Sequence, residues 1–131
     1  MIVKKLSEAK PYDAPNHRAV STLRIFGAEA GVSKKIVAGV SHFLPGGGAE
    51  LDATPVEKVY VVVSGEVTVT TPAGTVTLRP MDSCRLAPGE PRSIANATNL
   101  PASMLVIMPY PLPEGSGEPR WDAPVRQDGR S

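Results

Sequence analysis

Cysteine and histidine are scarce in this chain. Of its 131 residues, one is a cysteine and two are histidines. The lone Cys84 has no partner for an intramolecular disulfide, and the cysteine spacing of structural zinc sites is missing. We therefore expect a reducing compartment and a cytoplasmic protein. Cys84 itself is expected to be a small buried hydrophobe rather than a nucleophile.

Long apolar runs and a large excess of one charge are also missing. The N-terminal sequence MIVKKLSEAK lacks the apolar stretch of a secretory signal, and no later segment approaches the roughly 20 apolar residues of a membrane span. The formal net charge is +1, and lysine and arginine are scattered along the chain. These features argue against a membrane or nucleic-acid partner.

Proline and glycine are plentiful: 14 prolines and 12 glycines separate short apolar runs. This punctuation is typical of a turn-rich, all-β barrel or sandwich, and the length fits one domain. We expect an N-terminal arm at 1–18, a barrel at 19–109 and a proline-rich tail at 110–131. Strands are predicted over 19–26, 33–44, 58–63, 66–71, 75–80, 83–86 and 104–108, and a further strand is expected around Arg92.

Two turn predictions organise these strands. Residues 45–48, PGGG, are predicted to form a tight turn, because glycine weakens a regular strand. A phosphate-binding loop is disfavoured, since neither a following helix nor a GK[ST] ending is present. Residues 58–79 are predicted to form a meander of paired strands, with turns at Gly65 and at 72–74.

Four short motifs carry a family resemblance. They are PGGG at 45–48, EKVYVVVSGE at 57–66, RPMD at 79–82 and APGEPRSIAN at 87–96. Together they resemble the cupin superfamily over about residues 35–109. The resemblance implies a double-stranded β-helix, or jelly-roll barrel, that is usually a homodimer. It also implies an interior that commonly holds a divalent metal bound by three histidines and one glutamate.

The chain departs from the family at every one of those ligand positions. The His-x-His-Pro pattern falls on 52–55, so Asp52 and Thr54 replace two histidines, Lys58 replaces the glutamate and Arg92 replaces the last histidine. Protonated lysine and arginine donate hydrogen bonds and do not ligate metals. We therefore expect no metal and no cofactor at the usual place. A displaced metal site, built from His42, His17 and an acid, stays open.

The replaced positions predict a charged pocket. Alternation places Lys58 and Tyr60 on one face of their strand, and the resemblance points Lys58 and Arg92 into the barrel. Burying either cation without compensation costs several kcal/mol. Asp52 and Glu57 offer one compensation, an internal salt-bridge network. The other is an anionic ligand, with Arg92 gripping a carboxylate and Lys58, Tyr60 and Asp52 completing the substrate-binding set.

The two histidines are candidates for proton transfer. His42 precedes the PGGG segment, where a side chain is expected to project toward the barrel mouth. His17 lies in the arm, which in this family often covers a barrel or crosses to a dimer partner. Histidine titrates near neutral pH and is a common general base. The predicted catalytic residues are His42, His17 and Lys58.

The sequence thus favours a small cupin that binds a small anionic, carboxylate-bearing organic molecule. Its predicted chemistry is that of a metal-independent isomerase, lyase or decarboxylase. Two alternatives stay open: a non-catalytic binding or sensor cupin, and a metal-dependent, dioxygenase-like cupin with a displaced site.

Overall fold

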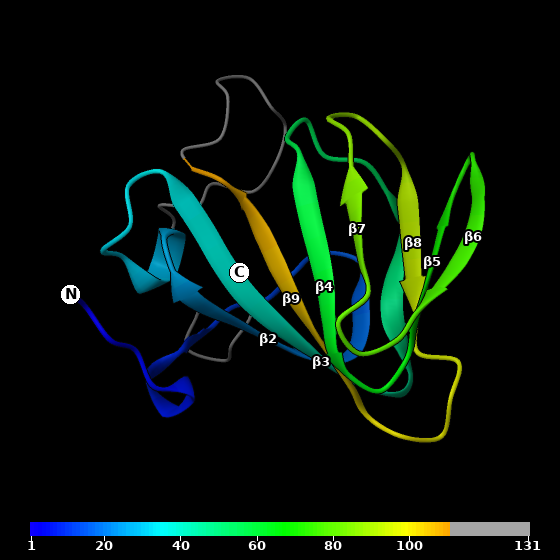
Figure 1. Ribbon diagram of the computed structural model, residues 1–131, viewed down its shortest axis with the longest axis horizontal. Coiled ribbons are helices and arrows are strands. Elements are labelled where there is room, and N and C mark those ends of the chain that lie inside the picture. The colour runs from blue at the N-terminus through cyan, green and yellow to red at the C-terminus, as the bar shows by residue number, and fades with distance from the viewer. Residues whose placement is uncertain (111–131) are drawn as a thin grey trace.

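Nine β-strands make up most of the regular structure in the computed structural model, which describes residues 1–110 (Figure 1). No helix in this range is long and apolar enough to span a membrane. The predicted tail covers residues 110–131, and all of it after Tyr110 lies outside the described residues. The strands are β1 (Lys10–Pro11), β2 (His17–Phe26), β3 (Ile36–Asp52), β4 (Lys58–Ser64), β5 (Val67–Thr71), β6 (Gly74–Leu78), β7 (Ser83–Leu86), β8 (Arg92–Ala95) and β9 (Ala102–Pro109); two 3-10 helices are η1 (Leu6–Glu8) and η2 (Ala28–Ala30).

The strands form one antiparallel sheet that curls into a nearly closed barrel (Figure 1). Its order is β6-β5-β8-β3-β9-β4-β7, with β2 paired to β3 and β1 paired to β2. The all-β jelly-roll fold expected from the sequence is confirmed.

The predicted meander over 58–79 is correct in its second half, where β5 and β6 pair across the turn at 72–74, and wrong in its first half. Strand β4 pairs with β7 and β9, whereas β5 pairs with β6 and β8, so the turn at Gly65 joins strands that are not neighbours. Gly65 has a φ of +74°, and a Cβ there would lie 2.5 Å from the Pro101 carbonyl oxygen. The chain thus passes close to the start of β9 as it crosses between the two halves of the barrel. Alternation identifies strands but does not identify their partners.

The predicted turn at PGGG is also wrong, because β3 continues through it. Strand β3 pairs with β9 as far as the Phe43–Ala102 pair and with β8 from the Gly48–Ala95 pair. The glycines therefore lie where β3 changes partner. A Cβ on Gly47 would lie 2.3 Å from the Ala19 carbonyl oxygen, and one on Gly48 would lie 2.1 Å from the Ile94 carbonyl oxygen. Only glycine allows the neighbouring backbones to approach so closely.

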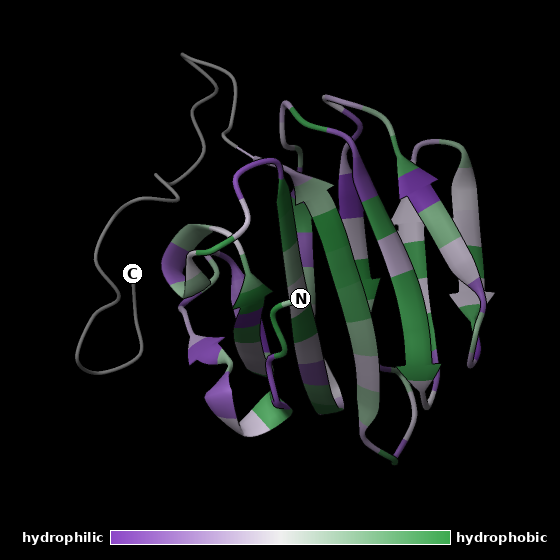
Figure 2. Cartoon of the chain, turned by 60° about the vertical axis from the view of Figure 1, so that its left-hand side comes forward, coloured by the Kyte–Doolittle hydropathy of each residue, from purple (hydrophilic) through white to green (hydrophobic). Residues whose placement is uncertain are grey.

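The barrel interior is lined by alternate residues of these strands. Aliphatic side chains fill most of it, and Figure 2 shows the hydrophobic residues running along the strands. The inward set on β4 ends in Val62, which is fully buried, and begins with the charged Lys58, which is 8% exposed. The core is Val37, Phe43, Ala49, Val56, Tyr60, Val62, Val67, Val69, Leu78, Leu86, Ile94, Ala102, Met104, Val106 and Met108.

We expect Gly48→Ala to lower the free energy of unfolding by about 3 kcal/mol, because its methyl group would meet a backbone oxygen that cannot move away cheaply. The matched control is Gly46→Ala. Gly46 has a φ of +79° and open space around its Cβ position, so it adds only backbone strain of about 1 kcal/mol. Urea denaturation measures both. Equal losses in the two variants would contradict the packing role of Gly48.

Candidate functional site

Arg92 is the buried cation around which the candidate site is built. It begins β8 and is only 6% exposed. Its Nε donates a hydrogen bond to the Tyr60 hydroxyl at 3.0 Å, and its Nη1 donates to the Glu50 carbonyl oxygen at 3.1 Å. Both acceptors are neutral. Within residues 1–110, no carboxylate lies within 4 Å of the guanidinium nitrogens, so the internal salt bridge considered for Arg92 is not formed there.

Three other side chains predicted for this site share the interior with Arg92. Lys58 and Tyr60 are buried on the inward face of β4, at 8% and 2% exposure. Asp52 ends β3 directly across from Arg92 in the β3–β8 pairing, and directly paired residues lie on the same face of a sheet. One Asp52 carboxylate oxygen accepts a hydrogen bond from the Ala53 backbone at 2.8 Å. The structure brings these four residues together, while their roles stay predictions.

Glu57, the second carboxylate considered for compensation, lies elsewhere. It is exposed and forms an ion pair with exposed Arg85 on the adjacent strand β7. This ion pair directs the Glu57 carboxylate to Arg85 at the surface and not to Arg92. Surface ion pairs of this kind contribute little to stability.

His17 also points into the barrel. It pairs with Ala49 on β3, and Ala49 pairs with Ile94 on β8. Ala49 and Ile94 both belong to the buried core, so the register places His17 on the same inner face. Ile94 is two residues from Arg92 on the same strand, and the His17 ring therefore lies close to the buried cations.

Burial, a hydrogen bond and nearby charges together set the protonation of His17. Its Nδ1 lies 2.7 Å from the Pro15 carbonyl oxygen. A carbonyl only accepts, so Nδ1 carries the proton in the neutral ring and Nε2 keeps its lone pair. Burial lowers the pKa of His17 below its usual value; the Pro15 hydrogen bond opposes that shift, and the positive charges of Arg92 and Lys58 lower the pKa further. A neutral imidazole near pH 7 is the form that accepts a proton.

His42 does not join this group. It was expected to project toward the barrel mouth, but it pairs with Ser103 of β9 and Ser21 of β2. Its neighbours in sequence, Ser41 and Phe43, are the buried ones. The His42 ring therefore lies on the outer face, where Nδ1 is 2.7 Å from the Ser103 hydroxyl oxygen. The difference arises because β3 carries apolar residues on both faces, so its pattern does not mark the inner one.

The residues at the family's metal-binding positions do not fit a divalent metal. Lys58 and Arg92 are hydrogen-bond donors that repel a cation, and Thr54 uses its hydroxyl for a weak contact with the Val56 carbonyl oxygen at 3.4 Å. Within residues 1–110, no three His, Cys, Asp or Glu side chains are grouped to hold a metal ion.

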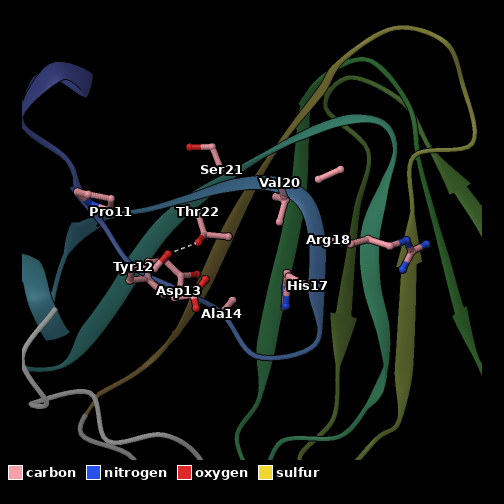
Figure 3. Close-up of a pocket in the computed structure, with 10 residues that line it drawn as sticks. Pro11, Tyr12, Asp13, Ala14, His17, Arg18, Val20, Ser21 and Thr22 are labelled. Atoms are coloured by element: carbon pink, nitrogen blue, oxygen red, sulfur yellow. Dashed lines mark hydrogen bonds between the residues drawn. The ribbon is translucent and has the colours of Figure 1, made fainter. Parts of the chain in front are cut away.

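A cavity of about 280 Å³ is lined by the segment that leads into β2 and by the first residues of β2 itself; Figure 3 shows these residues. We call it the arm cavity. His17 lines it together with Tyr12 and Asp13, while Arg18 extends away from those two residues toward β3 and β8 (Figure 3). Its lining residues are Pro11, Tyr12, Asp13, Ala14, His17, Arg18, Ala19, Val20, Ser21 and Thr22.

Sequence reasoning missed three contributors to the site. Tyr12 and Asp13 were assigned to a polar arm, although an aromatic and an acidic residue held between Pro11 and Pro15 were an available signal. The third is the Glu50 carbonyl, which binds Arg92 through the backbone. No side-chain pattern reports a backbone acceptor.

Replacing Arg92 with glutamine is expected to raise the pKa of His17, because one positive charge that disfavours the imidazolium is removed. Titration of the His17 ring by NMR measures the change. The control is Arg79→Gln, which removes the same charge from an exposed residue paired with Glu66. If both variants leave the His17 pKa where it is, the two side chains do not share an environment.

The same pKa shift makes stability depend on pH. Since the folded state binds a proton on His17 less readily than the unfolded state, stability falls as pH drops below about 6.5, the ordinary histidine value. The loss ends once the pH passes the lower pKa of the folded state. His17→Gln should flatten this part of a curve of unfolding free energy against pH, and an unchanged slope would contradict the burial of His17.

Several solved structures share this fold. A polyketide cyclase from Streptomyces resistomycificus superposes with a TM-score of 0.76 at 16% identity, over 86% of this chain and 82% of the cyclase. A predicted oxalate decarboxylase from Thermotoga maritima gives a TM-score of 0.70 at 21% identity, over 82% of this chain and 98% of that protein. Identities this low establish the fold alone.

Sequence comparison goes further. The β-D-galactosidase Rv1717 of Mycobacterium tuberculosis is 43% identical over 114 residues, which cover 87% of this chain and 98% of that relative. The Cupin domain family model matches residues 39–108, from near the start of β3 to near the end of β9. This chain therefore belongs to the Cupin domain family.

Proposed function

We propose that the barrel binds a small organic molecule through a carboxylate group and transfers a proton on it without a metal, as an isomerase, lyase or decarboxylase. The observation that carries this proposal is the state of Arg92. Its guanidinium is buried and its hydrogen bonds go to two neutral acceptors. A guanidinium has five N–H donors in a planar fork that matches a carboxylate.

The neighbours of Arg92 suit the same ligand. Tyr60 accepts one hydrogen bond and thereby fixes the plane of the guanidinium. Lys58 adds a second buried positive charge from β4, the strand that also carries Tyr60. Charge-assisted hydrogen bonds of this kind are the strongest available to a small acid, especially where water is excluded.

His17 supports the proton-transfer part of the proposal. Its Nε2 is the unprotonated nitrogen, since Nδ1 donates to the Pro15 carbonyl oxygen. In the proposed isomerisation or elimination, Nε2 takes a proton from a carbon next to the carboxylate and Arg92 and Lys58 stabilise the negative charge that develops. The imidazolium then returns the proton to a neighbouring carbon in the isomerisation, or gives it to the departing group in the elimination. In a decarboxylation the bond to the departing CO2 breaks instead, and a protonated His17 donates the proton that replaces it. His42 has no part in this step, because it lies on the outer face.

Arg92→Gln is expected to weaken binding of a simple carboxylate such as propionate about 10- to 100-fold, the effect of losing a hydrogen-bonded charge pair. Chemical-shift titration of the labelled protein measures the dissociation constant. Arg85→Gln, a change of the same charge on the exposed outer surface, should leave it unaltered. Carboxylate binding that survives in Arg92→Gln at full strength would overturn the role of Arg92.

A second candidate function is hydrolysis of β-D-galactosides, favoured by the 43% identity to a protein of that name. Most glycoside hydrolases use two carboxyl groups, one as an acid and one as a base or nucleophile. The site offers Asp52 in the barrel and Asp13 in the arm cavity.

For this candidate, the wild-type chain should release p-nitrophenol from p-nitrophenyl β-D-galactopyranoside, followed by its absorbance. Asp52→Asn and Asp13→Asn should each lower kcat at least 100-fold, the scale of losing a general acid or base. Glu66→Asn, on an exposed carboxylate, is the control. Galactoside turnover that persists in both aspartate variants would remove these two residues from the reaction.

The homodimer and the cytoplasmic location expected from the sequence stay predictions.

A further inference from the structure

The arm cavity and the Arg92 site share one backbone anchor. The Glu50 backbone N–H donates to the Asn16 carbonyl oxygen at 2.9 Å, and the Glu50 carbonyl accepts from Arg92 at 3.1 Å. Asn16 directly precedes His17, which lines the arm cavity and faces the barrel interior. His17 is thus the residue that the two sites share, since it lines the arm cavity and its ring is near enough to Arg92 to feel that positive charge.

Buried contacts hold the wall of the arm cavity in place. The Arg24 guanidinium lies 3.7 Å from the centre of the Tyr12 ring, and Arg24 Nε pairs with a Glu29 carboxylate oxygen at 3.2 Å. Arg24 is 1% exposed, so this stack and ion pair are shielded from water. Thr22 adds a hydrogen bond from its hydroxyl to the Tyr12 carbonyl oxygen (Figure 3).

The backbone on either side of Glu29 is strained. Ala28 has a φ of +49° and Val32 has a φ of +70°. Left-handed backbone is costly for residues with a side chain, most of all for a β-branched one. Strain of this kind persists only where surrounding contacts fix it. The contacts beside this segment are the Arg24–Glu29 ion pair and the stacking of Arg24 on Tyr12.

We propose that the arm cavity binds the hydroxyl-bearing part of the ligand whose carboxylate Arg92 holds, which makes the substrate class a polyhydroxylated acid such as a sugar acid. This inference rests on the proposed carboxylate site and extends it. It assigns ligand contacts to Tyr12 and Asp13.

The chemistry of the arm cavity suits hydroxyl groups. The carboxylate of Asp13 accepts hydrogen bonds from hydroxyls and repels a second acid group. Burial raises the pKa of Tyr12 above its usual value, so its phenol stays protonated and is able to donate. The cavity volume of about 280 Å³ lies just below the range of about 300–1,000 Å³ that is usual for ligand pockets. This size favours a single sugar unit over a larger molecule.

The test compares three probes on the full chain by chemical-shift titration: D-galacturonate, which has both groups, propionate, which has only the carboxylate, and methyl β-D-galactopyranoside, which has only hydroxyls. D-Galacturonate should bind at least 10-fold more tightly than propionate. Asp13→Asn should weaken D-galacturonate about 10-fold and leave propionate unchanged. Arg92→Gln should weaken both acids. Glu66→Gln, which neutralises an exposed carboxylate, should change neither.

Each contrary result overturns a different claim. If D-galacturonate binds no more tightly than propionate, or if Asp13→Asn weakens both acids equally, the arm subsite is wrong and the carboxylate site at Arg92 stands. If neither acid binds, but the galactoside binds and loses affinity in Asp13→Asn, the role of Arg92 is wrong and the arm subsite for hydroxyls stands without the acid. If no probe binds, both proposals fall.

Discussion

The guanidinium of Arg92, held in the barrel between the Tyr60 hydroxyl and the Glu50 carbonyl, is the interaction on which the rest of the site depends. Taking a full charge out of water costs several kcal/mol, and neutral acceptors offset only part of that cost. Lys58 is a second buried cation in the interior, and the charges of both residues act on His17. The same charge that opposes a bound cation also favours the neutral form of His17.

The segment before β2 is a structural wall of this site. Glu50 joins it to the barrel through both of its backbone groups. The buried Arg24–Glu29 pair then stacks against Tyr12 from the other side. Removing one member of such a pair leaves a buried charge without its partner, which is far more disruptive than losing a surface ion pair. The shape of the arm cavity is therefore coupled to the interior of the barrel.

Alternation in the sequence placed Lys58 and Tyr60 on one face of β4, because strand side chains repeat every two residues. The family resemblance, and not the alternation, pointed that face and Arg92 into the barrel. Alternation could not predict which strands pair with each other. The turn at Gly65 has the sequence of a hairpin turn, yet the two strands that it joins, β4 and β5, pair with other strands. His42 shows a second limit. The pattern gave its face correctly relative to Phe43, but only the packed barrel decides which of the two faces is the interior.

Strand β3 touches β2, β8 and β9, so it belongs to both halves of the barrel. Its partner β9 begins at Ala102, some 60 residues after the segment it completes. Contacts this distant in sequence are slow to form, since a long loop must close first. During synthesis β3 emerges from the ribosome well before either β8 or β9, so its edges stay unpaired until those strands have been made. A chain stopped short of β9 would leave the edges of both β3 and β4 unpaired and open to other chains, so the loss of this strand exposes the protein to aggregation.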